Sequence, residues 1–87
     1  MNTLVPHGEY NDNQLLQMLD EPGTWLIRGG PTGVMGGPTG SLRAALARSR
    51  DLSMQGYSPG PVVRMPDDGV VVLPKQIFRL WQKLYPV

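Results

Sequence analysis

With 87 residues, 40% of them hydrophobic, and a formal net charge of +1, the chain is long enough for one small domain and no more. It has no cysteine, which excludes disulfides, thiolate metal sites and thiol nucleophiles. No apolar run approaches the roughly 20 residues that span a bilayer, and no signal pattern opens the chain, so we expect a soluble, cytoplasmic protein.

An arm and a helix are expected first. Residues 1–9 show no hydrophobic periodicity, which indicates a flexible arm ahead of a single domain over residues 10–87. Asn11 and Gln14 have the spacing of a capping box, in which each side chain accepts a hydrogen bond from the other residue's backbone N–H. This spacing predicts a helix that starts after Asn11 and ends at Pro22.

A short strand and a glycine-rich segment follow. Residues 24–28 alternate and are rich in strand-forming residues, which predicts a strand. The phrase Gly-Gly-Pro-Thr-Gly then occurs twice, at residues 29–33 and again at residues 36–40. Because glycine and proline favour turns, we predict a glycine-rich loop over residues 29–40.

This predicted loop has two interpretations, and we favour the plainer one, a turn-rich connector. In the other, backbone N–H groups at the start of the following helix surround a phosphate or carboxylate. The lysine of a P-loop is missing, since Ser41 and Leu42 follow Gly40. The candidate residues of such an anion loop are Gly36, Gly37, Thr39, Gly40, Ser41 and Arg28.

The second half of the chain predicts a helix, a hairpin and another helix. Apolar residues at helical spacing predict a helix over residues 41–55, ended by Gly56 in the left-handed conformation. Valine-rich runs at residues 62–65 and 70–73 flank a Pro-Asp-Asp-Gly turn, which predicts a β-hairpin. A broad apolar arc predicts the last helix over residues 75–85.

Together these patterns predict a small single α+β domain with the order α-β-α-β-β-α. The expected architecture is a three-stranded, mostly antiparallel sheet with helices packed on one face. The side chains expected to meet in one core cluster are Trp25, Leu46, Ile77, Trp81 and Leu84.

Charge is distributed unevenly along the chain. Residues 1–23 carry acids and no Lys or Arg, whereas residues 24–87 carry all 8 basic residues. Either the acidic segment pairs with the basic remainder, or a basic surface is exposed to an anionic partner. On the last helix three basic residues are four apart, and two arginines share a flank of the middle helix. We call these five residues the candidate basic face, namely Lys75, Arg79, Lys83, Arg43 and Arg50. The alternative interpretation is that they form an ordinary solvated surface.

Residues 14–28 resemble the first helix and the arginine-bearing strand of SH2 domains. The resemblance rests on Gln14-Leu15-Leu16 and on Pro22-Gly23-Thr24-Trp25-Leu26-Ile27-Arg28. In that family the strand arginine grips phosphotyrosine, and Arg28 stands at the matching position. The resemblance covers about a sixth of the chain and ends at the proline-glycine segment, so we transfer neither the family's fold nor its ligand.

Catalytic chemistry has little support in the sequence. His7 is the only histidine and lies in the expected arm, so a catalytic triad or a histidine metal site would have to be assembled around it alone. Asp67 and Asp68 are adjacent in a turn, where local capping explains them. We therefore expect no enzyme, no metal and no cofactor.

The leading hypothesis is a small non-enzymatic binding or regulatory domain. Its expected partner is another protein or a second copy of the chain. The alternative is a DNA- or RNA-binding protein that uses the basic face. A third hypothesis is phosphate or nucleotide binding at the glycine-rich loop. None of these patterns specifies the partner or the biological process.

Overall fold

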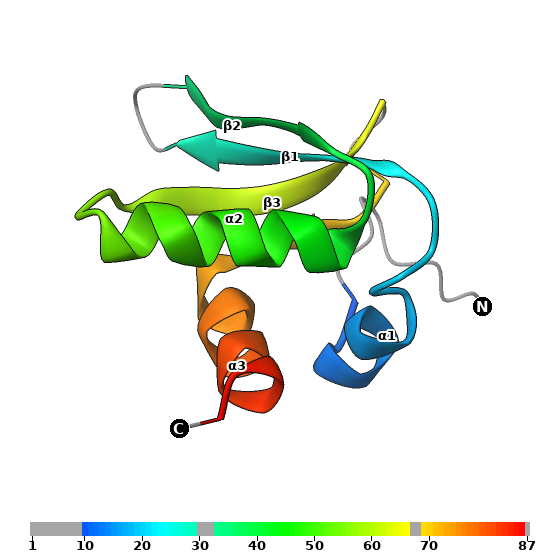
Figure 1. Cartoon of the computed structure of the whole chain (residues 1–87). Helices are drawn as coiled ribbons and strands as arrows, with labels where there is room; N and C mark the ends of the chain where they lie inside the picture. Colours follow the sequence, from blue (N-terminus) through cyan, green and yellow to red (C-terminus); the bar gives the residue numbers. More distant parts are fainter. Residues whose placement is uncertain (1–9, 30–32, 67–68, 87) are drawn as a thin grey trace.

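The computed structural model describes residues 10–29, 33–66 and 69–86, and within residues 33–35 only the backbone. The expected arm over residues 1–9, with His7, lies outside the described residues, as do Asp67 and Asp68 of the predicted turn. The described chain forms three helices and a four-stranded antiparallel sheet in the order α-β-β-α-β-β-α (Figure 1).

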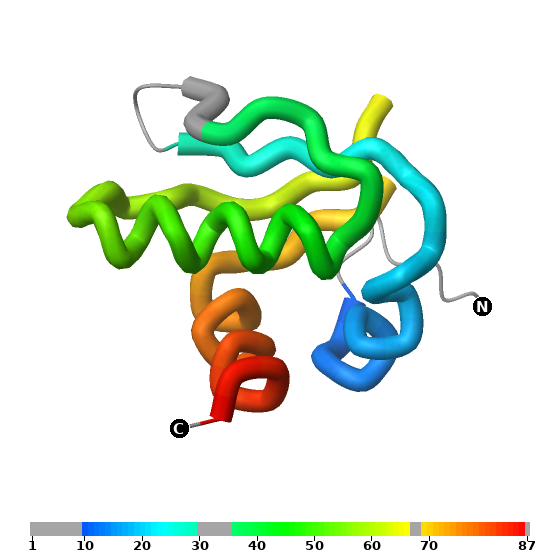
Figure 2. Tube along the Cα trace, viewed as in Figure 1, coloured from blue at the N-terminus to red at the C-terminus, as the bar shows by residue number. Residues whose placement is uncertain are grey.

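The elements are α1 (Asp12–Gln17), β1 (Thr24–Gly29), β2 (Gly33–Thr39), α2 (Leu42–Met54), β3 (Pro59–Met65), β4 (Val71–Val72) and α3 (Pro74–Leu84). The strands are arranged in the sheet as β2-β1-β3-β4. All three helices lie on the same face of this sheet (Figures 1 and 2). The predicted α+β class and the one-sided helix layer are thus confirmed.

The prediction of a loop over residues 29–40 is wrong, because most of this segment forms strand β2. The strand pairs with β1 in an antiparallel register that places Thr39 beside Trp25 and Gly36 beside Ile27. A Cβ on Gly36 would lie 2.8 Å from Ile27 Cδ1, so glycine makes room there for a buried side chain. The sheet accordingly has four strands instead of three, and the stated element order lacked β2.

The core lies between the sheet and the helices. Trp25 and Ile27 point from β1 to the helical side, and Leu46 and Ile77 meet them from α2 and α3. Trp81 and Leu84 are partly buried and pack against this cluster. The predicted core cluster is therefore confirmed, with α3 contributing its last two members at the edge.

The local signals at the start of α1 form as the sequence indicates. The Gln14 N–H donates to Asn11 Oδ1 at 2.8 Å, and the Asn11 N–H donates to Gln14 Oε1 at 2.9 Å. The helix itself is shorter than expected and ends at Gln17, well before Pro22. Helix α1 thus has only 6 residues and depends on tertiary contacts.

The two ends of α2 also follow local signals. The Ala44 N–H donates to Ser41 Oγ at 3.2 Å, which makes Ser41 the N-cap. At the other end Gly56 has a φ of +97°, and the Tyr57 N–H donates to the Leu52 carbonyl at 3.0 Å. This is the Schellman arrangement that the glycine predicted.

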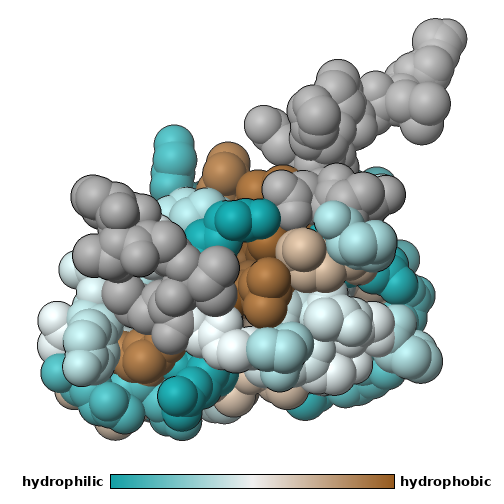
Figure 3. All heavy atoms as spheres, turned by 90° about the horizontal axis from the view of Figure 1, so that it is seen from above, coloured by the Kyte–Doolittle hydropathy of each residue, from teal (hydrophilic) through white to brown (hydrophobic). Residues whose placement is uncertain are grey.

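The sheet face away from the helices carries an apolar row. Leu26, Val63 and Val71 are neighbours across β1, β3 and β4, and they alternate with residues that point into the core. Figure 3 looks onto this face and shows hydrophobic residues over the middle of the sheet. The sheet is therefore apolar on both faces, with Val63 only 3% exposed.

Strands β1 and β3 approach each other closely at Gly60, and this contact leads to a stability prediction. An added Cβ on Gly60 would overlap the carbonyl oxygen of Arg28, and only movement of the β1 or β3 backbone can relieve that overlap. We expect Gly60→Ala to lower the free energy of unfolding by roughly 1–3 kcal/mol, as measured by urea denaturation. The matched control is Gly37→Ala in β2, whose new Cβ meets nothing within 4 Å. Equal stabilities for the two variants would contradict the prediction.

Candidate functional site

Two of the five residues of the predicted basic face are bound to acids of the N-terminal segment. Arg79 donates from Nε to Asp12 Oδ2 at 2.7 Å and from Nη2 to Asp12 Oδ1 at 3.1 Å. Arg43 makes the same two-point contact with Asp20, at 2.8 and 3.1 Å. The uneven charge distribution therefore reflects pairing within the chain, which was the first of the two interpretations.

The other three residues of the basic face have different surroundings. The guanidinium of Arg50 lies over the ring of Tyr85, 4.5 Å from its centroid, in a cation–π contact. Lys75 and Lys83 are exposed on α3, and neither makes an ion pair within the described part of the chain. Within the described residues, these two lysines are therefore the charges of the predicted face that make neither an ion pair nor a cation–π contact.

The candidate anion loop does not converge on one point. Gly36, Gly37 and Thr39 belong to strand β2, and the Thr39 hydroxyl donates to the Ser41 carbonyl at 3.2 Å. Arg28 is paired with Val34, at the end of the hairpin away from Ser41.

The start of α2 is also engaged within the fold. The Arg43 N–H donates to the Leu19 carbonyl at 3.0 Å, and the Gly40 carbonyl accepts from the Gly23 N–H at 3.2 Å. Ser41 Oγ is occupied by the Ala44 N–H. The N–H groups of Arg43 and Ala44, which an anion at this helix start would use, thus already donate to protein oxygens.

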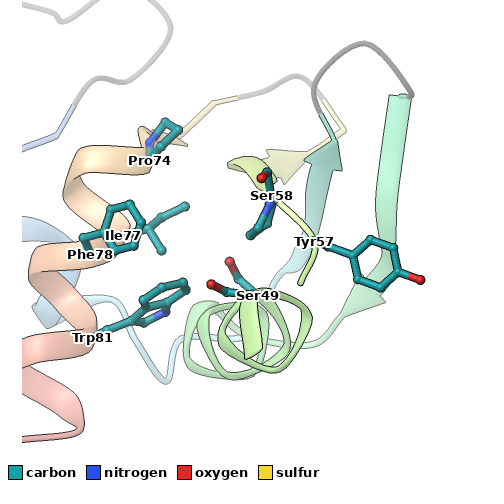
Figure 4. Close-up of a pocket in the computed structure, with 9 residues that line it drawn as sticks. Ser49, Tyr57, Ser58, Pro74, Ile77, Phe78 and Trp81 are labelled. Carbon is teal, nitrogen blue, oxygen red and sulfur yellow. The ribbon is translucent and has the colours of Figure 1, made fainter. Parts of the chain in front are cut away.

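A pocket of about 280 Å³ opens between α2, the start of β3 and α3, and we call it the α2–α3 pocket. Figure 4 shows its lining residues. Hydroxyl-bearing residues contribute from the α2 side, namely Ser49, Ser53, Tyr57 and Ser58. Apolar residues form the other walls, namely Pro59, Pro74, Ile77, Phe78 and Trp81.

Two aromatic rings define the α3 wall of the pocket. Phe78 is 58% exposed, and its ring meets that of Trp81 edge to face, with 5.2 Å between centroids. Trp81 Nε1 donates to the Leu46 carbonyl at 3.1 Å, which fixes the indole against α2. The ring of Tyr57 extends away from the pocket in Figure 4. Phe78 and Trp81 therefore form a preset aromatic surface.

Ser49 lies at the floor of the pocket, on the apolar stripe of α2. Its side chain points toward Trp81 and Ile77 (Figure 4) and is fully buried. The Oγ atom has no hydrogen-bond partner within the described structure. A buried hydroxyl without a partner is costly, so this atom marks where a ligand's polar atom would be stabilised.

The described residues that line the α2–α3 pocket carry no charge. No Asp, Glu, His, Lys or Arg is among them. Over residues 10–29, 33–66 and 69–86, no three potential metal ligands come together. The pocket therefore suits an uncharged group and offers hydroxyls and aromatic edges for its recognition.

Comparison with known proteins leaves the function to be argued from this geometry. The chain matches no protein-family model, and neither the curated proteins nor the solved structures include a similar one. Among the described helices, none has the length and apolar character needed to cross a membrane.

The α2–α3 pocket was missed in the sequence because its parts have ordinary roles when considered separately. Ile77, Phe78 and Trp81 belong to the apolar arc of α3, which predicted core packing. One signal was present, namely a serine at position 49 within a stripe otherwise made of Leu and Ala. A polar residue at a core position indicates either a local hydrogen bond or a site, and the structure shows no such bond.

The Asp12–Arg79 pair predicts a pH dependence of stability. Hydrogen bonding from Arg79 holds the pKa of the Asp12 carboxyl below its ordinary value of 3.8. Because this pKa is lower in the folded protein, the pair stabilises the fold above the unfolded-state pKa. That stabilisation is lost as the pH falls through the folded-state pKa.

We therefore expect Asp12→Asn to cost about 0.2–1 kcal/mol of unfolding free energy at neutral pH and less near pH 2. Urea denaturation of both proteins at the two pH values measures this difference. The control is Asp51→Asn, which removes an exposed acid of α2 that makes no ion pair within the described residues. A cost for Asp12→Asn that is the same at both pH values would refute the electrostatic explanation.

Proposed function

We propose that this chain is a non-enzymatic protein-binding domain and that the α2–α3 pocket, with Phe78 at its rim, is the contact surface. The observation that carries the proposal is the exposed Phe78 ring beside an uncharged pocket. Exposed aromatic rings at the edge of a concave site are characteristic of residues that dominate binding energy at protein interfaces.

The pocket is organised before a partner arrives, which supports this proposal. Trp81 is held by its hydrogen bond to the Leu46 carbonyl, and Phe78 is set against it edge to face. Side chains that are already ordered lose little conformational entropy on binding, so more of the contact energy is available for affinity. A partner that inserts one large side chain would cover both rings.

The lining chemistry favours binding over catalysis. General acid–base catalysis uses His, Asp, Glu or Lys in most enzymes, and none of these is among the described residues that line the pocket. We also propose a cytoplasmic location, since a chain without cysteine needs no disulfide and therefore suits a reducing compartment. A second copy of the chain is the other partner that a test must distinguish from a different protein.

Nucleic-acid binding receives less support than protein binding. Arg43 and Arg79 already neutralise acids of the same chain, which leaves fewer charges to replace the counterions of a phosphate backbone. We expect a fluorescently labelled DNA duplex or RNA strand to show no change in anisotropy with the protein at low salt. Salt-sensitive binding that is lost in a Lys75→Gln, Lys83→Gln double variant would instead favour the nucleic-acid function.

The contact surface is tested with peptides selected from a random displayed library on the full chain. We expect the selected peptides to shift amide resonances of Ile77, Phe78 and Trp81 in NMR titrations. Phe78→Ala should weaken their binding about tenfold or more, because an exposed aromatic ring is lost from the interface.

The matched control is Met54→Ala, which also removes an exposed apolar side chain, 72% exposed, outside the pocket lining. Its affinity for the peptides should equal that of the unchanged protein. Sedimentation of the protein alone distinguishes self-association through the same surface. Peptides that bind Phe78→Ala and the unchanged protein equally would overturn the proposed surface.

A further inference from the structure

We infer that the α2–α3 pocket is a binding site for a neutral aromatic ring that carries a hydroxyl group, with the Ser49 hydroxyl as its hydrogen-bond partner. This inference deepens the proposed function and, for a tyrosine of a partner protein, rests on it. A free phenolic small molecule presents the same chemistry. The size, charge and polarity of the pocket each limit the ligand independently.

The pocket has room for an aromatic ring system. Its volume of about 280 Å³ lies just below the range of roughly 300–1,000 Å³ that holds drug-sized ligands. On the α3 side the lining combines Ile77 with the rings of Phe78 and Trp81, which meet edge to face. Aromatic edges of this kind pack favourably on the face of another ring.

The absence of charge in the lining restricts the ligand further. An ionised group placed among Pro59, Pro74 and Ile77 would lose hydration without gaining a counter-charge from the described lining residues, none of which is charged. This excludes a carboxylate, a phosphate or an ammonium group at the floor. The occupant must therefore be neutral at the point where it reaches Ser49.

Ser49 supplies the specificity. Its hydroxyl can both donate and accept, it is fully buried, and it has no partner within the described structure. A phenolic hydroxyl also donates and accepts, so it satisfies this atom in either direction. A plain phenyl ring would fill the same space and leave the hydroxyl unpaired, which a site of this kind disfavours.

The test compares p-cresol with toluene, two ligands that differ by one hydroxyl, in NMR titrations of the full chain. We expect p-cresol to bind about tenfold more tightly than toluene and to shift the amide resonances of Ser49, Ile77 and Trp81. In Ser49→Ala this preference should fall close to one, with toluene binding retained. Retained toluene binding shows in the same sample that the variant is folded and its pocket intact.

The control variant is Ser53→Ala, which removes a hydroxyl one helical turn further along α2 and should keep the preference for p-cresol. Equal affinities for p-cresol and toluene in the unchanged protein would overturn the inference. An equal preference in the unchanged protein and in Ser49→Ala would also overturn it, as would resonance shifts that fall outside the pocket.

A second pair of ligands distinguishes the two sources of the ring. N-acetyl-tyrosinamide binding at least as tightly as p-cresol, and more tightly than N-acetyl-phenylalaninamide, supports a tyrosine of a partner protein. Binding of p-cresol alone supports a free phenol, and it would retain this inference while removing the proposed protein-binding function. Conversely, library peptides without tyrosine that bind at Phe78, together with equal affinities for p-cresol and toluene, would retain the protein-binding function and overturn this inference.

Discussion

The pairing of β1 on both of its edges is the constraint on which the rest of the structure depends. The strand hydrogen-bonds to β2 on one side and to β3 on the other, and it presents Trp25 and Ile27 to the helices. A glycine on each neighbouring strand makes this pairing possible. Gly36 leaves room for Ile27, and Gly60 lets β3 approach the β1 backbone closely. These two glycines thus serve close packing within the sheet.

Polar contacts between distant segments hold the small helix α1 in place. A helix of 6 residues is too short to persist without tertiary support, and burial of Leu15 provides part of that support. The remainder comes from α3, where Arg79 binds Asp12 and the Gln76 side-chain amide donates to the Tyr10 carbonyl at 2.6 Å. The acidic segment is therefore an integral part of the fold.

Features that depend on neighbouring residues could be predicted from the sequence. The Asn11 capping box, the Ser41 N-cap and the Gly56 helix end are each determined within a few residues of chain, and all three are present. Strand β2 could not be predicted in the same way. Glycine suits position 36 because of the side chain that it faces across the sheet. The strand propensity of the residues in β2 carries no information on that partner.

In the candidate site, too, local features could be predicted and contacts between distant residues could not. Helical spacing correctly placed Arg79 on an exposed flank of α3, but its partner Asp12 is 67 residues away along the chain. The α2–α3 pocket assembles side chains from α2, β3 and α3, so it exists only once those elements have packed. In the sequence, Ser49 was the one indication of the pocket, because it places a hydroxyl among the apolar residues of α2.

The form of the two edge strands, β2 and β4, affects whether another chain can pair with this sheet. An open sheet edge is a template for strand addition and aggregation, and this sheet also has an apolar row on the face away from the helices. Strand β4 is only 2 residues long, and the register of β2 is interrupted by two irregularities. Short and bulged edges align poorly with an incoming strand. Recruitment of another chain by backbone pairing at these two edges is thereby disfavoured.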